Sequence, residues 1–213
     1  MPLARLHVLT DHRLADGGGP GHAEQARRAA AGGAGAVQFR AKGGPDRDAF
    51  AALVATRDAL PAGVQLVVDD RLDWALAAGA DGVHLGQTDL PLAEARRLAD
   101  AVRPGLLIGA TVTTADQARR AQAEGADYLG FGPVFATGSK ANPASVKGLA
   151  GLAEACAAVE LPVVAIAGIT PDRVAGCLEA GAWGVAVMSA VTRATDPAAA
   201  AAELRVALQA ARP

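Results

Sequence analysis

Three polar side chains alternate along one short segment that reads as extended. Gln38, Arg40 and Lys42 are separated by Phe39 and Ala41, so in a strand they point to the same face. Two cations and an amide converging on one face suit a pyrophosphate group, because charged donors make strong hydrogen bonds to phosphate oxygens. The alternative is that Arg40 and Lys42 pair with carboxylates of the same domain.

Two carboxylates come from neighbouring segments of the same kind. Asp70 and Asp89 each follow a short apolar run. Two carboxylates near one strand edge, opposite a phosphate-bearing ligand, are what Mg²⁺ uses in proteins. The pair therefore predicts a magnesium site. Asp89 also has a second interpretation, as the N-cap of a helix that begins near Pro91.

Small and hydroxyl-bearing residues follow two further apolar runs near the end of the chain. Gly168 comes after one run, and Met188 and Ser189 end the other. Backbone N–H groups where helices begin after such strands form a recurring phosphate site. This pattern predicts a second anion site, and the alternative for Gly168 is that it only permits a tight turn.

The longest connection between apolar runs spans residues 133–162. It begins with the polar stretch PVFATGSKANPASVKG, which contains Thr137, Ser139 and Lys140. A connection of this length exceeds what a strand-to-helix turn needs, and such loops are frequently functional. We expect it to act as a lid over the site.

The elements that must position these residues appear as an internal repeat. Four Ala-rich helical stretches end in Gly-Ala, at residues 33, 79, 125 and 181, and each leads into a short apolar run. Glycine can adopt the left-handed conformation that closes a helix, and the apolar runs are typical of buried parallel strands. With four more apolar runs between them, the predicted strands are 6–10, 36–40, 65–69, 82–86, 106–110, 128–132, 163–167 and 185–189.

Helical patterns fill the gaps between these strands. Thr114 and Thr170 are predicted N-caps, and Pro171 lies where a first helical turn tolerates proline. Eight alternating units predict an α/β fold, a (βα)8 TIM barrel of eight parallel strands, with residues 1–213 as a single domain. A doubly wound open sheet is the alternative; the even eight-fold count and the lack of GxGxxG after the first strand disfavour it. Active sites of such barrels lie at the C-terminal strand ends, where the residues above are found.

Composition excludes several classes of function. The formal net charge is −2, which offers no surface for nucleic acid or anionic membrane. No uncharged apolar stretch is long enough to span a membrane. The N-terminus lacks a signal-peptide pattern and no disulfide framework is expected, so we expect a cytoplasmic protein. A homo-oligomer is compatible with the sequence, which does not define the oligomeric state.

Several chemically capable residues receive a structural interpretation. Cys156 and Cys177 lack metal-binding spacing and are interpreted as small buried helical side chains. His84 points inward in an apolar run and is interpreted as a core or pocket-wall residue rather than a base. Trp74 and Trp183 are assigned to core packing. The remaining histidines form no recognisable constellation: His7, His12 and His22.

Taken in order, the strand-end segments resemble the thiamine-phosphate synthase family. They are LTDHR, VQFRAK, VVDDR, GVHLGQTDLP, IGATVTT, GADYLGFGPVFATGSK, VVAIAGIT and VAVMSAV. They cover nearly the whole chain, and HLGQ-x-DLP together with GPVF-x-T is a specific combination. The resemblance implies a barrel that joins a hydroxymethylpyrimidine diphosphate to a thiazole phosphate, with Mg²⁺-assisted loss of pyrophosphate from a carbocation-like pyrimidine.

The resemblance also implies roles for individual residues. Gln38, Arg40 and Lys42 match the family's Q-x-R-x-K and would hold the pyrophosphate, while Asp70 and Asp89 would bind Mg²⁺. Further substrate contacts are implied for Asp69, Thr111, Thr137, Ser139, Lys140, Gly168, Met188 and Ser189. Within the whole set, the catalytic roles fall to Lys140, Thr111 and Arg40.

The chain departs from the family pattern at two of these positions. Asp69 stands where the family usually has Asn, which adds a negative charge beside the pyrophosphate site and should weaken anion binding unless it is metal-bound or protonated. Thr111 stands where the family has Ser, so the hydroxyl remains and a methyl group is added. The stretch after Lys140 is also less regular than the family's.

Two alternative functions stay open. A sister group with the same barrel acts as a thiazole tautomerase, and its members carry a His at the position of Thr113. The absence of that His favours the synthase, as does the presence of Lys42, Asp70, Asp89 and Lys140. The second alternative is a non-catalytic barrel that binds a thiamine precursor, motivated by Asp69 and Thr111.

Overall fold

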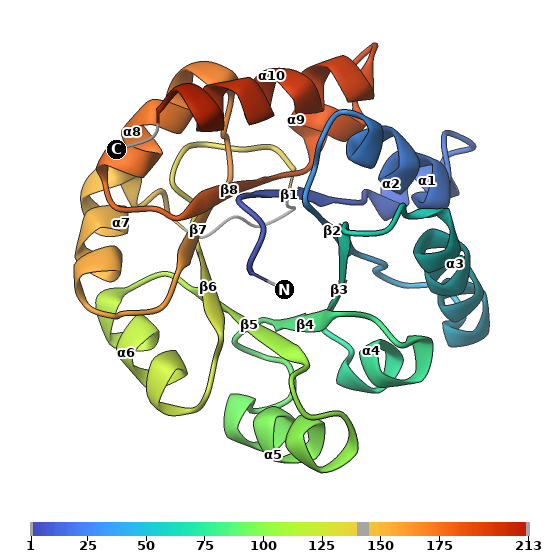
Figure 1. The fold of residues 1–213 in the computed structure, drawn as a ribbon, viewed down its shortest axis with the longest axis horizontal. Helices are drawn as coiled ribbons and strands as arrows, with labels where there is room; N and C mark the ends of the chain where they lie inside the picture. The colour runs from blue at the N-terminus through green and yellow to red at the C-terminus, as the bar shows by residue number, and fades with distance from the viewer. Residues whose placement is uncertain (1, 140–144, 212–213) are drawn as a thin grey trace.

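The strands of the protein form a closed ring surrounded by helices (Figure 1). The computed structural model describes residues 2–139 and 145–211. Each strand pairs in parallel with its neighbour in the chain, and β8 pairs with β1 to close the barrel. Its strands are β1 (Leu6–Leu9), β2 (Ala36–Phe39), β3 (Gln65–Asp69), β4 (Gly82–Leu85), β5 (Leu107–Val112), β6 (Tyr128–Phe131), β7 (Val163–Ile166) and β8 (Gly184–Val187). The predicted (βα)8 barrel is confirmed, and the alternative of an open sheet is excluded.

Helices form the outer ring. They are α1 (His12–Asp16), α2 (His22–Ala31), α3 (Asp46–Ala59), α4 (Leu72–Ala78), α5 (Leu92–Val102), α6 (Ala115–Ala123), α7 (Gly148–Ala157), α8 (Val174–Glu179), α9 (Ser189–Thr192) and α10 (Pro197–Ala210), with the 3₁₀ helix η1 (Pro171–Arg173) before α8. Thr114 caps α6 as predicted, because its hydroxyl accepts a hydrogen bond from the Gln117 N–H at 3.2 Å. Thr170 occupies the N-cap position of η1, yet its hydroxyl makes no capping hydrogen bond within the described chain.

Two apolar layers hold the barrel together. The larger lies between strands and helices, where strand residues such as Val37 and Phe39 pack against small helix residues such as Ala26 and Ala29. Alanine on the helices permits close approach to the sheet, and each fully buried large aliphatic side chain stabilises the fold by roughly 1.5–3 kcal/mol. The smaller layer fills the barrel interior with Leu9, Tyr128, Val164 and Ala186.

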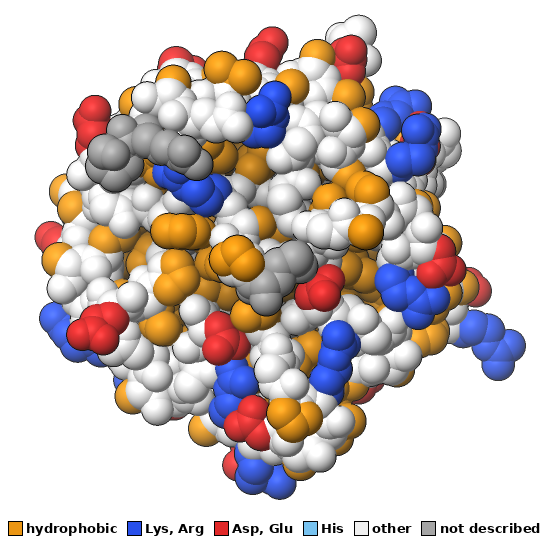
Figure 2. Space-filling model, in the orientation of Figure 1, with side chains coloured by type: hydrophobic (Ala, Val, Ile, Leu, Met, Phe, Trp, Pro, Cys, Tyr) orange, Lys and Arg blue, Asp and Glu red, His pale blue; other side chains and the backbone are white. Residues whose placement is uncertain are grey.

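The N-terminal segment closes one end of the barrel. The Ala4 N–H donates to Gln65 Oε1 at 3.0 Å, and the Trp183 indole donates to the Leu3 carbonyl at 3.2 Å. The chain therefore starts in the middle of the ring in Figure 1. Figure 2 shows this end with acidic and basic side chains interspersed around its rim, as a net charge of −2 leads one to expect. The N-terminal segment thus covers this end, and the opposite end is the one where the strands terminate.

The structure corrects two expectations about core residues. Trp183 is 42% exposed and stacks near the Arg5 guanidinium instead of packing in the core. Cys177 is buried, but Cys156 is only half-buried, and both thiols are free. Trp74 is half-buried against Phe50, edge to face. None of the helices within residues 2–139 and 145–211 combines the length and apolarity needed to cross a bilayer.

Candidate active site

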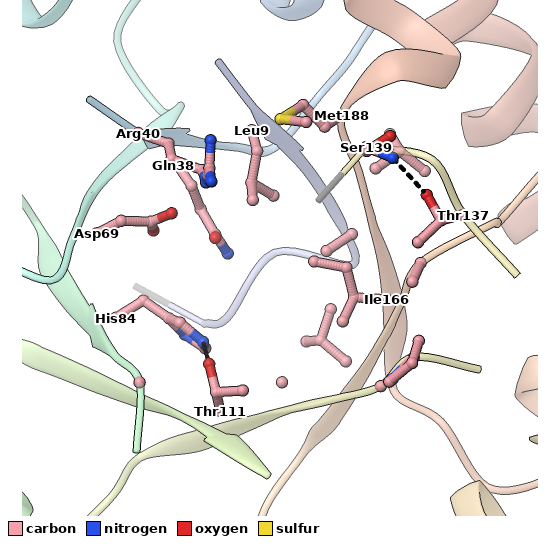
Figure 3. A pocket seen from close by; sticks show the side chains of 18 of the residues that line it. Leu9, Gln38, Arg40, Asp69, His84, Thr111, Thr137, Ser139, Ile166 and Met188 are labelled. Atoms are coloured by element: carbon pink, nitrogen blue, oxygen red, sulfur yellow. Dashed lines mark hydrogen bonds between the residues drawn. The ribbon is translucent and has the colours of Figure 1, made fainter. Parts of the chain in front are cut away.

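A pocket of about 480 Å³ lies at the C-terminal ends of the strands (Figure 3). This volume suits a small organic ligand. Every predicted site residue within the described chain lines it: Gln38, Arg40, Lys42, Asp69, Asp70, Asp89, Thr111, Thr137, Ser139, Gly168, Met188 and Ser189. Lys140 lies outside the described residues.

The cationic side of the pocket comes from β2 and the turn after it. Gln38 is buried, and its amide donates to His7 Nδ1 at 3.0 Å. The Arg40 guanidinium donates to His12 Nδ1 at 3.2 Å, which requires that ring nitrogen to be unprotonated. Burial and the adjacent Arg40 charge lower the pKa of His12, in keeping with this contact. Lys42 forms an ion pair with Asp70, so for this lysine the pairing alternative describes the ligand-free pocket.

Three carboxylates face this cationic side from β3 and β4. Asp69 ends β3, and its Oδ1 is buried without a hydrogen-bond partner among the described residues. Burial, reinforced by the neighbouring Asp70 charge, raises the pKa of Asp69 to about 8. Asp89 Oδ2 accepts a hydrogen bond from the Gly86 N–H at 2.6 Å. Asp89 is not a helix N-cap, because Pro91 holds that position before α5.

The carboxylates suit a hard cation that shares its ligands with a substrate. No cluster of three or more His, Cys, Asp or Glu side chains with metal-binding geometry occurs in the described part of the chain. Mg²⁺, however, is commonly bound by one or two carboxylates while substrate phosphates and waters complete its shell. Asp70 and Asp89 line the same pocket, and the unpartnered Asp69 oxygen adds acceptor capacity beside them. The donor set therefore fits Mg²⁺ bound together with a phosphate-bearing ligand.

A neutral imidazole forms the floor of the pocket. His84 lies 3.0 Å from Thr111 Oγ1 through one ring nitrogen and 3.0 Å from the Tyr128 hydroxyl through the other. Burial lowers the pKa of His84 to about 4, which keeps the ring uncharged near neutral pH. Gly109 is required beneath it, because a Cβ there would collide with the Tyr128 and His84 rings. This geometry agrees with a pocket-wall role for His84.

Hydroxyl groups and a strained turn form the side opposite the cations. The Ser139 N–H donates to Thr137 Oγ1 at 3.2 Å, and the hydroxyls of Ser139 and Ser189 are 2.7 Å apart. After β7, Ala167 and Gly168 both have positive φ, 82° and 65°. A Cβ on Gly168 would lie 2.5 Å from the Ala136 carbonyl oxygen, so glycine also lets the loop approach the strand end.

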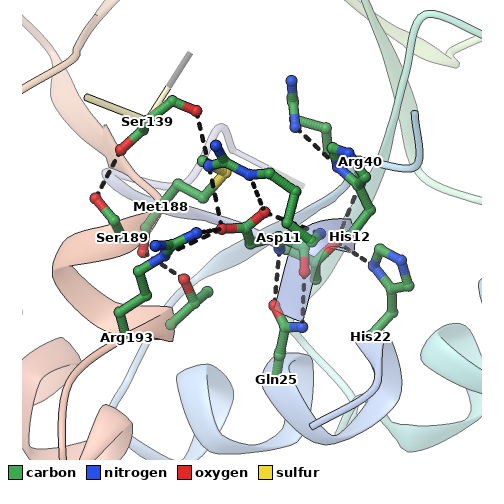
Figure 4. A network of polar contacts seen from close by, with 12 residues as sticks. Asp11, His12, His22, Gln25, Arg40, Ser139, Met188, Ser189 and Arg193 are labelled. Carbon is green, nitrogen blue, oxygen red and sulfur yellow. Dashed lines mark hydrogen bonds and ion pairs between the residues drawn. The ribbon is translucent and has the colours of Figure 1, made fainter. Parts of the chain in front are cut away.

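The structure shows polar contacts around the first strand that sequence analysis missed. Each of the three histidines has a hydrogen-bond partner of its own: His7 contacts Gln38, His12 contacts Arg40, and His22 Nδ1 lies 2.7 Å from Thr10 Oγ1. Asp11 holds two arginines in the same region (Figure 4). The polar residues of LTDHR, directly after the first strand, could have indicated such contacts. Their partners could not be identified from the sequence, because they lie far away along the chain.

Comparison with known proteins gives one consistent result. Residues 6–191 match the family model described as thiamine monophosphate synthase. A thiamine-phosphate synthase of Methanoculleus marisnigri is 53% identical over 208 residues, covering 97% of this chain and 96% of the relative. One of Salinibacter ruber is 50% identical, covering 97% and 89%. Among solved structures, thiamine phosphate pyrophosphorylase from Pyrococcus furiosus superposes with a TM-score of 0.86 at 39% identity, covering 98% of this chain and 97% of that one.

Proposed function

The chain belongs to the thiamine monophosphate synthase family, and from this premise we propose that it joins 4-amino-5-hydroxymethyl-2-methylpyrimidine diphosphate to thiazole phosphate. The reaction breaks the bond between the pyrimidine methylene carbon and the diphosphate oxygen and forms a carbon–nitrogen bond to the thiazole. Pyrophosphate leaves, which makes the protein a transferase of thiamine biosynthesis. The observation that carries the proposal is a single pocket with charged and hydroxyl-bearing walls facing each other in a member of this family.

The diphosphate would bind on the cationic wall. Gln38, Arg40 and Lys42 line it from one strand and the turn that follows. Arg40 would act in catalysis as well as binding, because donors aimed at the leaving group stabilise the charge that develops on it in the transition state. His12, by accepting a hydrogen bond from Arg40, holds the guanidinium at the pocket mouth.

Asp70 and Asp89 would hold Mg²⁺ beside the diphosphate. When bound, the ion would neutralise part of the leaving-group charge. The Lys42–Asp70 ion pair of the ligand-free pocket would then be replaced by contacts of each partner to substrate and metal. Such a replacement conserves charge pairing, since the lysine gains a phosphate when it loses a carboxylate.

The thiazole phosphate would bind on the hydroxyl wall. Thr137, Ser139 and Ser189 offer hydroxyl donors there, while Gly168 and Met188 complete the lining. Thr111, fixed by its contact with His84, would face the pyrimidine ring and assist the reacting centre. Lys140, assigned a catalytic role by the resemblance, stays a prediction because it lies outside the described residues.

The tautomerase alternative receives little support from the site. Its catalytic His would stand at Thr113, whose N–H and hydroxyl both donate to Gln117 Oε1, at 2.7 and 3.1 Å. Thr113 lines the pocket, but its hydroxyl donates to Gln117 at the start of α6, and threonine cannot supply the proton transfer that the tautomerase's His would provide. The non-catalytic alternative rests on Asp69 and Thr111. The raised pKa of Asp69 allows its carboxyl to be uncharged beside a diphosphate, and Thr111 keeps a hydroxyl in contact with His84, so neither substitution requires a loss of activity.

A coupling assay tests the proposed function directly. Purified protein is incubated with both substrates and Mg²⁺, and thiamine phosphate is read by fluorescence after oxidation. We expect product that disappears on chelation of the metal and returns when Mg²⁺ is restored. No product from folded protein that still binds thiazole phosphate would contradict the synthase and favour an alternative.

The proposal has three further parts. Residues 1–213 would form one barrel domain, and the protein would act in the cytoplasm, where its two free thiols stay reduced. The small-molecule substrates are its expected partners. A homo-oligomer is compatible with the proposal, and light scattering on the purified protein measures that state.

A further inference from the structure

A buried carboxylate lies behind the hydroxyl wall, outside the pocket lining. The Asp11 side chain has 0% exposure and accepts hydrogen bonds from two guanidiniums (Figure 4). Arg13 Nε reaches Oδ1 at 3.1 Å, and Arg193 Nη2 reaches Oδ2 at 3.0 Å. Burial opposes ionisation, but the hydrogen bonds from both arginines outweigh it and lower the pKa of Asp11. The carboxylate is therefore charged at neutral pH.

Asp11 is fixed to the barrel independently of the arginines. Its N–H donates to Gln25 Oε1 at 2.7 Å, and its carbonyl accepts from Gln25 Nε2 at 3.1 Å. Gln25 is itself buried and also donates to the Pro20 carbonyl at 2.8 Å. This two-point contact anchors the Asp11 backbone to α2. The carboxylate is thus a rigid support on which a flexible arginine side chain can be aligned.

Arg13 links Asp11 to the loop that follows β6. Its Nη2 donates to the backbone carbonyl of Ser139 at 2.8 Å, joining positions 126 residues apart in sequence. A carbonyl oxygen facing a phosphate would repel it, whereas this carbonyl is engaged by a group that does not line the pocket. The Ser139 hydroxyl meets that of Ser189 on the pocket side, at 2.7 Å. Arg13 thereby orients Ser139 with its hydroxyl toward the pocket.

The cluster also brings excess positive charge close to that hydroxyl pair. Arg13 and Arg193 carry two positive charges against the single negative charge of Asp11. The remaining charge lies behind neutral donors, where it favours an anion without contacting it. The orientation of the hydroxyl groups and the nearby positive charge both favour phosphate binding at the hydroxyl wall. The cationic wall has positively charged side chains of its own.

We propose that Arg13, aligned by Asp11, is a positioning residue that sets the affinity for the phosphate group of the thiazole substrate. The inference rests on the proposed function, since it assigns that phosphate to the Ser139–Ser189 pair. It predicts an effect selective for one of the two substrates. A residue needed only for folding would not discriminate between them.

The test compares Arg13→Ala and Arg13→Lys with the wild type. For Arg13→Ala we expect the KM for thiazole phosphate to rise about 10-fold, because a charge-assisted hydrogen bond is lost. The KM for the pyrimidine diphosphate and kcat should stay within about twofold. Arg13→Lys should restore part of the affinity, since an ammonium can still reach a carbonyl. Arg27→Ala, which removes another arginine from an ion pair, on α2, is the matched control and should change neither KM.

Direct binding separates failure of this inference from failure of the proposed function. Calorimetric titration of thiazole phosphate needs no turnover, and thermal unfolding shows whether each variant is folded. A wild type that binds thiazole phosphate but makes no product contradicts the synthase, while weaker binding by folded Arg13→Ala still supports the positioning role. Unchanged binding, or an equal rise of both KM values, would overturn that role.

Discussion

The two walls of the pocket accommodate phosphate groups in contrasting ways. The wall formed by β2, β3 and β4 is charged, and its groups already have one another as partners, as Lys42 and Asp70 show. Among the described residues, the wall formed by β6, β7 and β8 lines the pocket with uncharged side chains, and its donors are hydroxyls positioned by the backbone. Figure 3 shows Arg40 and Asp69 on one side and Thr137 and Ser139 on the other.

The two walls meet different requirements of one reaction. A diphosphate that must leave with a metal needs contacts that can be exchanged, and ion pairs within the wall provide alternative partners. A monophosphate that stays on the product needs only a fixed cradle. Fixing that cradle requires positive φ at Ala167 and Gly168, which strains the backbone at the alanine and is permitted by the glycine. We therefore expect the charged wall to respond mainly to charge changes and the hydroxyl wall mainly to steric ones.

The largest effect is expected from removing a carboxylate of the charged wall. Asp89→Ala should reduce Mg²⁺-dependent turnover at least about 100-fold, because one of only two proposed metal ligands is lost. The melting temperature should change little, since Asp89 lies in a turn after β4 and not in the apolar core. Steady-state kinetics across a Mg²⁺ titration measure the loss. Asp46→Ala, an exposed carboxylate paired with Arg71, is the control, and normal turnover by Asp89→Ala would refute the metal assignment.

Adding one methyl group at Gly168 should weaken phosphate binding at the hydroxyl wall. Gly168→Ala would place a Cβ 2.5 Å from the Ala136 carbonyl oxygen and 2.8 Å from Phe135 Cβ, at a residue with φ of 65°. We expect the KM for thiazole phosphate to rise on the order of 10-fold, with about 1–3 kcal/mol of lost stability from the backbone strain. Gly138→Ala is a matched control on the same loop, because its Cβ would meet no atom of residues 2–139 and 145–211 within 4 Å. Equal effects of the two variants would contradict the steric explanation.

Removing a charge without changing shape should have a smaller effect, in the opposite direction. Asp69→Asn replaces a buried carboxyl whose oxygen lacks a partner within the described chain. We expect activity to be kept near neutral pH, where Asp69 is largely protonated, and the KM for the pyrimidine diphosphate to fall by about 2- to 5-fold above pH 8, where the ionised carboxyl would repel it. Kinetics with each substrate varied in turn measure this. A large loss of activity would instead identify Asp69 as a metal ligand.

The smallest effect on catalysis is expected from replacing His7, which lies beneath both walls of the pocket. The same replacement should clearly alter how stability depends on pH. His7 is fully buried, and burial lowers its pKa to about 4 from 6.5. Between these two values the unfolded chain binds a proton that the folded chain does not, so stability falls as pH falls. The stability is fully present above pH 6.5, and the loss levels off below pH 4. His7→Gln should therefore reduce the slope of unfolding free energy against pH by about 1.4 kcal/mol per pH unit in this range.

Denaturant unfolding at several pH values measures that slope. Both KM values of His7→Gln should stay close to those of the wild type at pH 7.5, because His7 does not line the pocket and meets it through Gln38 and the Tyr128 ring. An unchanged slope would mean that the ring is protonated in the folded protein. A selective loss of diphosphate binding would show that the charged wall extends down to His7.

The sequence predicted the barrel and the pocket lining because both follow from local pattern. Every predicted strand lies within two residues of its observed bounds. A polar residue that follows an apolar strand within a few positions, as Asp89 and Ser189 do, lies at the mouth of a parallel barrel. Partners were harder to predict: the contact of Arg13 with Ser139 depends on side-chain conformation and on positions 126 residues apart. Trp183 was misassigned because a large aromatic beside a strand is equally compatible with the core and with the rim.

The pairing of β8 with β1 has a consequence for how the chain opens. In an open sheet the outermost strand can detach by breaking one set of hydrogen bonds, and it offers a free edge to other chains. Here Val8 pairs with Val37 on one side and with Val187 on the other, so no strand can leave without breaking two ladders. We expect amide hydrogens of the first and last strands to exchange with solvent as slowly as those of the middle ones. The two halves of the chain would then unfold together, and neither would be able to fray from its end.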